Sequence, residues 1–162
     1  MSAGPRVSLP VAVVMARRVV SGKGWRVPSW RVVGVVSGAE PAVKQARGTS
    51  IRSDADEEHF LWGGLQVELF RDAAGSYWAN LTGSQPALFV LCREDEHGQL
   101  VPKAVTADQD EASSGVEVDD RVFSAPIPPD VYQHLEAFVV EHHVPEEKRK
   151  RKRSDWSARE ES

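Results

Sequence analysis

The sequence predicts an α+β fold, in which an antiparallel β-meander or a small barrel-like sheet is closed by one C-terminal amphipathic helix. Three observations predict it. β-Branched and alternating apolar residues fill much of the first 107 positions, and stretches rich in glycine or proline separate them. The last apolar segment changes to a helical period. We therefore expect one β-rich domain over residues 1–145, with its helix at 129–143, and a flexible basic and acidic tail over residues 146–162.

The N-terminal third predicts two short strands. Residues 9–20, LPVAVVMARRVV, are rich in β-branched side chains, which crowd a helix but suit a pleated strand. Residues 21–30, SGKGWRVPSW, are typical of a loop because they contain two glycines and a proline. Residues 30–38, WRVVGVVSG, predict a second strand that ends in a turn. Residues 38–58 have weak periodicity, so we expect a long loop there with one helical turn near Ala42–Ala46.

The centre of the chain carries the clearest local pattern. Apolar and polar residues alternate in residues 65–69, LQVEL, as in a half-buried strand. Residues 71–75, RDAAG, predict a hairpin turn with a positive φ at Gly75. Residues 77–82, YWANLT, alternate again and predict the returning strand. The apolar segment ALFVLCRED, residues 87–95, then predicts a third strand, which a short turn connects to a fourth at 100–107.

The C-terminal part predicts an exposed loop followed by a helix. Residues 108–120, DQDEASSGVEVDD, hold six acids in thirteen positions and are expected to lie in water. Val131, Leu135, Phe138 and Val139 then share one face of a 3.6-residue period. Two prolines precede this helix, where proline is tolerated, and another proline follows it.

Charge is distributed unevenly along the chain. Residues 1–52 carry nine Lys or Arg and one acid, a net charge of +8. Residues 53–145 carry four Lys or Arg and eighteen acids, a net charge of −14. Residues 146–162 carry seven Lys or Arg and five acids. The overall charge of −4 is therefore a poor guide to partners, and the local fields matter more.

No motif in the sequence points to catalysis or metal binding. The single cysteine, Cys92, lies in an apolar segment and is expected to be a small core residue. The five histidines lack the spacing of a zinc motif, and the acidic residues after Asp108 lack the spacing of a calcium loop. No glycine-rich phosphate loop is present. We therefore predict no catalytic residue, no metal ligand and no cofactor.

Two sets of residues are candidates for partner binding. The first places tryptophan beside arginine in the basic N-terminal third: Trp25, Arg26, Trp30 and Arg31. The alternative for this set is packing of the rings at strand ends, with solvated arginines.

The second set is the basic run of the tail with the tryptophan after it: Lys148, Arg149, Lys150, Arg151, Lys152, Arg153 and Trp156. Three interpretations of this run are open: a peptide that docks on a protein, a nucleic-acid arm, or a solvated end paired with the domain's own acids.

Four segments of the chain, in their order, resemble a bacterial family of uncharacterised proteins encoded near molybdenum-dependent formate dehydrogenase genes. They are PVAVVMARR, WRVVGVV, VELFRDAAGSYWANLTGSQPALFVLCRE and PPDVYQHLEAFVVEHHVPEEKRKRKRSDW. The resemblance covers most of the chain except residues 38–58 and 108–120. It implies a cytoplasmic accessory role in making or maturing that enzyme, and it assigns no residue of this chain a catalytic role. Some members are labelled molybdopterin-guanine dinucleotide biosynthesis proteins.

The leading expectation is a cytoplasmic, non-enzymatic accessory or binding protein in the biogenesis of molybdenum-dependent formate dehydrogenase. Its expected partner is a protein, either that enzyme or one of its maturation factors. The first alternative is a nucleic-acid-binding regulator that uses the basic tail and the N-terminal arginines. The second is an enzyme of nucleotide transfer in molybdenum-cofactor biosynthesis, which predicts GTP binding. No membrane contact is expected, because no apolar segment approaches the roughly 20 residues of a membrane span.

Overall fold

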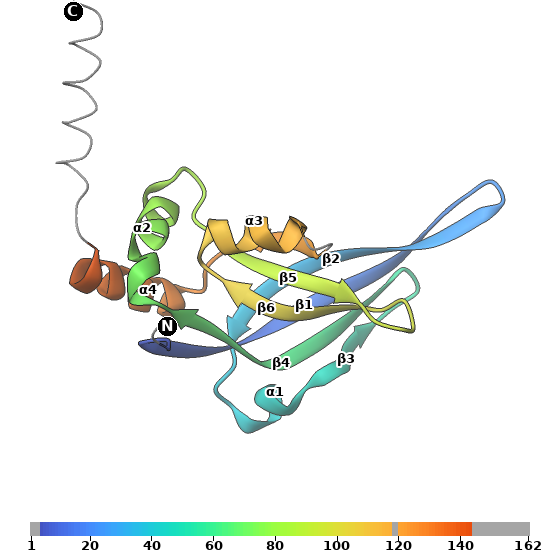
Figure 1. Cartoon of the computed structure of the whole chain (residues 1–162). Coiled ribbons are helices and arrows are strands. Elements are labelled where there is room, and N and C mark those ends of the chain that lie inside the picture. Colours follow the sequence, from blue (N-terminus) through green and yellow to red (C-terminus); the bar gives the residue numbers. More distant parts are fainter. Residues whose placement is uncertain (1–3, 118–119, 144–162) are drawn as a thin grey trace, which may run out of the picture.

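The computed structural model describes residues 4–117 and 120–143 (Figure 1). The strands are β1 (Val7–Gly22), β2 (Trp25–Ser37), β3 (Arg47–Ser53), β4 (Glu57–Leu69), β5 (Leu88–Glu94), β6 (Leu100–Thr106) and β7 (Arg121–Ala125). The helices are α1 (Pro41–Gln45), the 3-10 turn η1 (Arg71–Ala73), α2 (Ala74–Thr82), α3 (Gln109–Glu117) and α4 (Pro129–His142). Strands account for 50% and helices for 28% of the described residues, so the fold is mostly β.

The seven strands form one sheet that nearly closes into a barrel. The strand order is β2-β1-β4-β6-β5-β7, with β3 beside β4, and the end strands β2 and β7 contact each other. Every strand pair is antiparallel except β4 with β6, which meet at Val67 and Val105. The expected barrel-like sheet is confirmed, but the expectation of a purely antiparallel sheet is wrong. A parallel pair needs a crossover connection, and α2 and β5 supply it.

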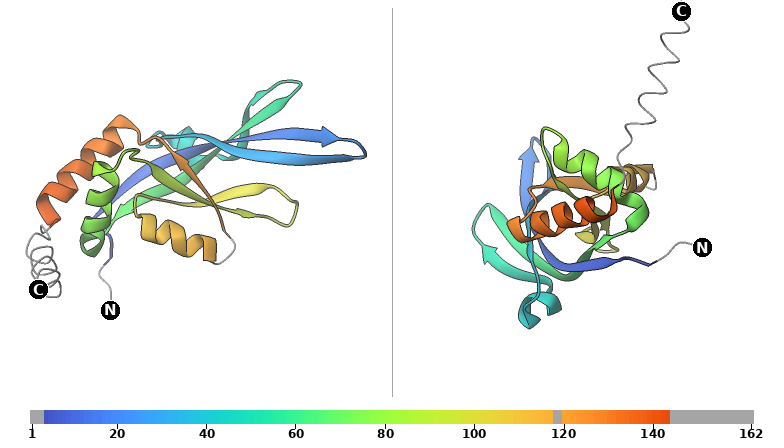
Figure 2. Two further views of the ribbon diagram at one scale, coloured as in Figure 1. Left: turned by 90° about the horizontal axis from the view of Figure 1, so that it is seen from above. Right: turned by 90° about the vertical axis from the view of Figure 1, so that its left-hand side faces the viewer.

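Two helices, rather than the single one predicted, cover one end of the barrel. Helix α4 buries the four residues that its period predicts, Val131, Leu135, Phe138 and Val139. Helix α2 packs against α4, where Tyr77 meets Phe138 edge to face with ring centroids 5.9 Å apart. The turns of the β1–β2, β3–β4 and β5–β6 hairpins lie at the opposite end of the molecule (Figures 1 and 2).

Residues 71–82 form η1 and α2, so the predicted turn at 71–75 and strand at 77–82 are wrong. The buried side chains of this segment, Ala74 and Tyr77, and the core contact of Leu81 are three and four residues apart, which is a helical spacing. Tyr77 and Leu81 also fit an alternating pattern, and this overlap explains the error. Gly75 lies inside the helix and does not have a positive φ.

Three predicted loops are partly or wholly regular structure. Residues 21–30 continue the strands β1 and β2 around a tight turn, so the predicted loop is wrong. Residues 47–53 form β3 within the long loop expected at 38–58, although α1 confirms the helical turn expected there. The segment predicted as an acidic loop, 108–120, contains α3. Its helix starts after Asp108, whose carboxylate accepts a hydrogen bond of 2.9 Å from the backbone N–H of Asp110.

The remaining strand predictions are confirmed. The segments at 9–20, 30–38, 65–69, 87–95 and 100–107 fall in β1, β2, β4, β5 and β6, in that order. Their alternate residues fill the barrel, and the fully buried set includes Val11, Val13 and Met15 of β1. The prediction that Cys92 is a core residue is also confirmed, because its side chain is fully buried.

Candidate interaction arm

The β1–β2 hairpin extends beyond the barrel as a two-stranded ribbon (Figures 1 and 2). Strand β1 pairs with β4 only as far as Arg18, which lies opposite Glu57. It pairs with β2 farther, up to Gly22 opposite Trp25. Within the described structure, no third strand pairs with residues 19–28. We call residues 19–28 the arm, and the region around Arg18 and Glu57 its root.

Local sequence signals explain why the arm is a hairpin. Val19, Val20 and Val27 are β-branched residues, which favour the extended backbone. Lys23 and Gly24 form a two-residue turn, and Gly24 has a φ of 75°, in the left-handed region that favours glycine.

Directly opposite residues of an antiparallel pair project from the same face, and this rule sorts the arm into two faces. Val20 lies opposite Val27, and Gly22 lies opposite Trp25, on one face. A Cβ atom at Gly22 would lie 2.4 Å from the indole ring of Trp25, so the ring rests against the Gly22 backbone. We call Val20, Trp25 and Val27 the valine–tryptophan face. Val19 lies on the other face.

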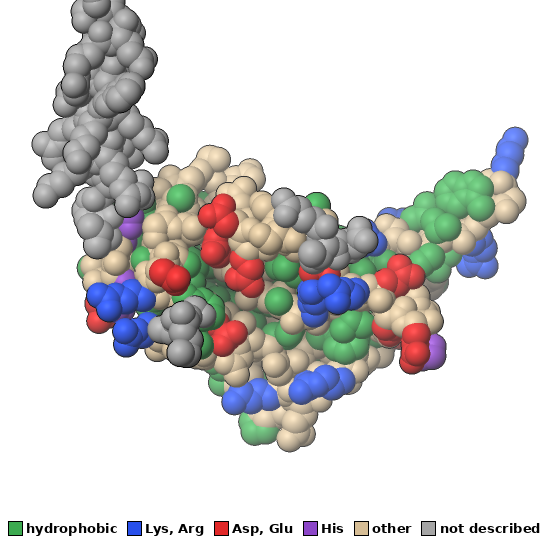
Figure 3. Space-filling model, in the orientation of Figure 1, with side chains coloured by type: hydrophobic (Ala, Val, Ile, Leu, Met, Phe, Trp, Pro, Cys, Tyr) green, Lys and Arg blue, Asp and Glu red, His purple; other side chains and the backbone are tan. Residues whose placement is uncertain are grey.

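The arm leaves its large apolar side chains in water. The exposed fractions are 47% for Val19, 40% for Val20, 51% for Trp25 and 49% for Val27. Figure 3 shows hydrophobic and basic side chains along the projecting ribbon. These side chains lie outside the core cluster, so the arm carries a set of exposed apolar groups on one extended element.

The arm is also basic. Arg18, Lys23 and Arg26 lie on it or at its root, and no acidic residue occurs between Arg6 and Glu40. No carboxylate of the described residues forms an ion pair with any of these three cations. The arm therefore presents uncompensated positive charge next to its apolar side chains.

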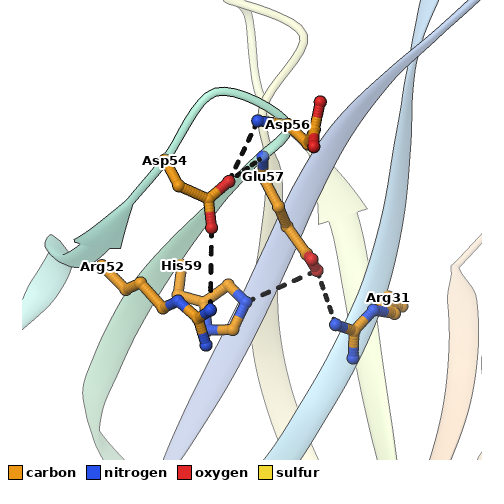
Figure 4. A network of polar contacts seen from close by, with 6 residues as sticks. All are labelled: Arg31, Arg52, Asp54, Asp56, Glu57 and His59. Carbon is orange, nitrogen blue, oxygen red and sulfur yellow. Dashed lines mark hydrogen bonds and ion pairs between the residues drawn. The ribbon is translucent and has the colours of Figure 1, made fainter.

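Acidic residues gather at the root, in the turn between β3 and β4 (Figure 4). Glu57 Oε1 lies 2.5 Å from Arg31 Nη2 and 3.4 Å from His59 Nε2. The carboxylate of Asp54 accepts the backbone N–H groups of Asp56 and Glu57, each at 2.9 Å. These two bonds hold the pKa of Asp54 below its usual value. The side chain of Asp56 points away from this network (Figure 4).

A second set of contacts fixes the root to the barrel. Arg17 Nη2 lies 3.1 Å from Glu58 Oε1. The guanidinium of Arg17 also lies over two aromatic rings, 5.9 Å from the centroid of Trp30 and 5.5 Å from that of Phe60. The arm is therefore held at one end and reaches into solvent at the other.

The structure places the four predicted N-terminal residues in different environments. Trp25 and Arg26 lie on the arm, and because they are consecutive in a strand they project from opposite faces. Trp30 is buried, with 8% of its surface exposed. Arg31 is exposed and is paired with Glu57. The basic run of the tail and Trp156 lie outside the described residues.

Sequence reasoning missed Val19, Val20 and Val27 as surface residues. Val19 and Val20 fell at the end of a predicted strand whose faces were not assigned, and Val27 fell in the predicted loop at 21–30. The signal that could have identified them is the turn: Lys23 and Gly24 between two valine-containing segments predict a hairpin long enough to leave the sheet.

Another charged cluster lies on the barrel wall and connects β5, β6 and the residue before β7. The carboxylate of Asp120 accepts hydrogen bonds from Arg93 Nε at 3.0 Å and Arg93 Nη2 at 2.8 Å, and Lys103 Nζ lies 2.7 Å away. The Asp120 side chain is 1% exposed. The hydrogen bond from Lys103 is the largest cause that holds the pKa of Asp120 below its usual value, and the bonds from Arg93 lower it further. This cluster ties strands together and has a structural role.

Two hollows on the described part of the chain are poorly suited to a nucleotide. One, of about 370 Å³, lies between β4 and β6, and the residues that line it include Glu68, Lys103 and Glu111. Its only cation, Lys103, is already paired with Asp120. The other, of about 640 Å³, lies beside the loop between α2 and β5, and no Lys, Arg or His lines it. Neither hollow presents a cationic group free to bind phosphate.

The described residues give no sign of metal or thiol chemistry. Among them, no group of three or more His, Cys, Asp or Glu side chains is arranged to hold a metal ion. Burial raises the pKa of the Cys92 thiol to about 12, so the thiol is protonated at neutral pH. None of the described helices has the length and apolar character needed to cross a membrane.

Fold and surface together define the class of protein: a barrel-like β domain with two helices over one end and a basic, apolar ribbon at the other. The chain belongs to the family described as protein of unknown function DUF3305, and the match spans residues 10–152. That range includes the arm and its root. No curated protein and no solved structure shows significant similarity to the chain.

Proposed function

We propose that this chain is a non-enzymatic binding protein whose arm docks a protein partner. The observation that carries the proposal is the exposure of Val19, Val20, Trp25 and Val27 on a ribbon that projects from the barrel. Tryptophan and arginine in an apolar setting are the residues that most often dominate binding energy at protein interfaces. Ion pairs at the root hold the ribbon in place, which lowers the entropy lost on binding.

The charge around the arm favours a protein partner over a nucleic acid. A nucleic-acid backbone is uniformly anionic, and it would meet Asp54 and Asp56 beside the root as well as Lys23 and Arg26 on the arm. Residues 53–145, which include most of the strands and helices behind the arm, have a net charge of −14. A protein surface can instead place charges of both signs opposite the arm and its root.

The resemblance to the family encoded near formate dehydrogenase genes suggests which protein the partner is. A molybdenum-dependent formate dehydrogenase, or one of its maturation factors, would be the protein that the arm contacts in an accessory role. This part of the proposal rests on the resemblance alone. The nucleotide-transfer alternative has less support, because neither hollow offers a free cation for phosphate.

The test is a binding measurement with purified formate dehydrogenase immobilised as bait. Trp25→Ser combined with Val27→Ser is expected to weaken binding of the full-length protein at least about tenfold, because both residues lie on the valine–tryptophan face. Trp78→Ser is the matched control, since Trp78 is exposed to a similar degree (47%) but lies on α2 at the other end of the molecule. Equal binding by the arm variant and the wild type would contradict the proposal.

The charge variant Lys23→Glu tests the nucleic-acid alternative. A duplex or single-stranded oligonucleotide that bound tightly, with an affinity falling steeply as salt rises and lost in Lys23→Glu, would favour that alternative over protein docking. We expect no such binding at physiological ionic strength.

A further inference from the structure

We infer that the arm binds a second copy of this chain, with the two arms packed antiparallel across a two-fold axis so that the tip of each lies on the root of the other. The inference rests on the proposed function, because it uses the same binding surface, and a second copy would compete with formate dehydrogenase for that surface. The proposed binding partner is a second copy of the same chain, so no other molecule is needed.

The order of chemistry along the arm supports this pairing. Lys23 lies at the tip, and Val20 and Val27 lie in the middle. The root carries charges of both signs, Arg18 among them, and Asp56 beside it forms no ion pair with a described residue. Reversing one copy brings the unpaired Lys23 of each copy to the unpaired Asp56 of the other. A two-fold interface requires this kind of self-complementarity, because the same patch serves both subunits.

The length of the arm fits the arrangement. Gly22 at the tip is four positions beyond Arg18 at the root, a distance of about 13 Å along a strand. With the axis close to the Val20–Val27 pair, the valines of the two copies would meet at the centre. Each Lys23 would then lie near Asp56 of the other copy, whose carboxylate points away from its own network (Figure 4).

The two arms are expected to meet through their faces, with their edges left unpaired. Pro28 lies on β2 within the arm and has no backbone N–H to donate, which discourages an added strand along that edge. The valine–tryptophan face, by contrast, combines an apolar surface with a ring held in one position against Gly22. An interface of two ribbons lies at the low end of interface sizes, below about 1,200 Å², so the dimer should be reversible and depend on concentration.

The test is sedimentation of the full-length protein over a range of concentrations. Wild type should shift from the 17.9 kDa mass of one chain toward twice that mass as its concentration rises. Lys23→Glu and Asp56→Lys should each weaken the dimer several-fold to about tenfold, because each reversal creates repulsion at two symmetry-related contacts. Lys44→Glu and Glu136→Lys are the matched controls, since these exposed residues lie on α1 and α4, away from the arm.

The decisive sample is an equimolar mixture of the two arm variants. In a mixed dimer, the acidic tip of Lys23→Glu meets the basic root of Asp56→Lys, and the basic tip of Asp56→Lys meets the acidic root of Lys23→Glu. Dimerisation should therefore return in the mixture to near the wild-type level. Failure of the mixture to dimerise would overturn the tip-to-root arrangement.

Two other outcomes would also overturn the inference. A wild-type protein that stays at the mass of one chain at every concentration has no such dimer. A dimer that Trp25→Ser leaves unchanged has its interface elsewhere. In either case the proposed function is judged separately by the binding to formate dehydrogenase, so failure of one does not imply failure of the other.

Discussion

At the scale of single residues, the contact between Trp25 and Gly22 decides how the arm presents its aromatic ring. A side chain at position 22 would occupy the space of the ring, because its Cβ atom would lie 2.4 Å away. A Cβ atom at position 22 would therefore displace the ring, whereas glycine leaves the ring held in place before any partner arrives. Fixing an aromatic group in its bound position is a common route to affinity.

Gly22→Ala is therefore expected to weaken association through the arm several-fold while the barrel keeps its stability. The measurement is sedimentation together with thermal unfolding. Gly34→Ala is the control on the same hairpin, because nothing lies within 4 Å of the Cβ atom it would add. An unchanged dimer in Gly22→Ala would show that the position of the ring does not matter.

A second prediction at this scale concerns Asp120 and the pH dependence of stability. Its bonds to Lys103 and Arg93 lower its pKa in the folded state. The ionised carboxylate therefore stabilises the fold above its unfolded-state pKa of about 3.9, and this contribution is lost as the pH falls through the lower folded-state value. Asp120→Asn should lower the Tm at pH 7, and the difference from wild type should shrink as the pH falls below about 4. A difference that stayed constant down to pH 2 would contradict this account of the cluster.

At the scale of elements, α2 shows where sequence reasoning failed and why. The residues 77–82 fit a strand if Tyr77, Ala79 and Leu81 are counted, and a helix if Ala74, Tyr77 and Leu81 are counted. Nothing within so short a segment distinguishes the two patterns. The structure distinguishes them through contacts distant in sequence, since Tyr77 packs against Phe138 of α4. Helix α4 itself was predictable because its period continues over more than two turns.

The start of α2 is fixed by a hydrogen bond that can be removed. The hydroxyl of Tyr77 accepts a hydrogen bond of 3.0 Å from the backbone N–H of Phe70. Burial, the largest cause, raises the pKa of Tyr77 to about 12. Tyr77→Phe should leave this partly buried N–H without an acceptor and reduce the free energy of unfolding by about 1–3 kcal/mol. Urea unfolding measures the change. Tyr132→Phe, in α4, is the control, because no described residue bonds to its hydroxyl; equal stability of the two variants would contradict the prediction.

The arm illustrates a different limit of sequence reasoning. The sequence predicts its strands in part, at 9–20 and 30–38, but the glycines and the proline between them predict a loop. In the structure, Gly24 forms the turn and Gly22 makes room for Trp25. Both glycines belong to a regular hairpin. Local composition could not show that no third strand of the described residues lies beside it.

At the scale of the whole molecule, the chain has two different ends. Helices α2 and α4 cover one end of the barrel, and three hairpin turns lie at the other (Figure 2). At the hairpin end, charges that are far apart in the sequence come close together in space. The arm, which has no acidic residue, lies beside the acidic turn between β3 and β4. Composition predicted that local electrostatic fields would influence partner binding more than the net charge. It also predicted Trp25 and Arg26 as partner-binding residues. It could not place Asp56 beside the arm, because that contact depends on the pairing of β1 with β4.

The central claim is that the arm serves binding and not folding, and shortening the arm tests it most directly. Deleting residues 19–22 and 25–28 joins Arg18 to Ser29 through the native Lys23-Gly24 turn. Arg18 and Ser29 are already paired with each other in the native hairpin. Their pair lies an even number of pairs from the Gly22–Trp25 pair, so the hydrogen-bond register is kept.

The measurement is the Tm and the sedimentation of this shortened protein beside wild type. Our account predicts a Tm within a few degrees of wild type, because no residue of the arm is buried, together with loss of the concentration-dependent dimer and of binding to formate dehydrogenase. A folded, shortened protein that still dimerises and still binds would contradict the claim, and so would a protein that no longer folds.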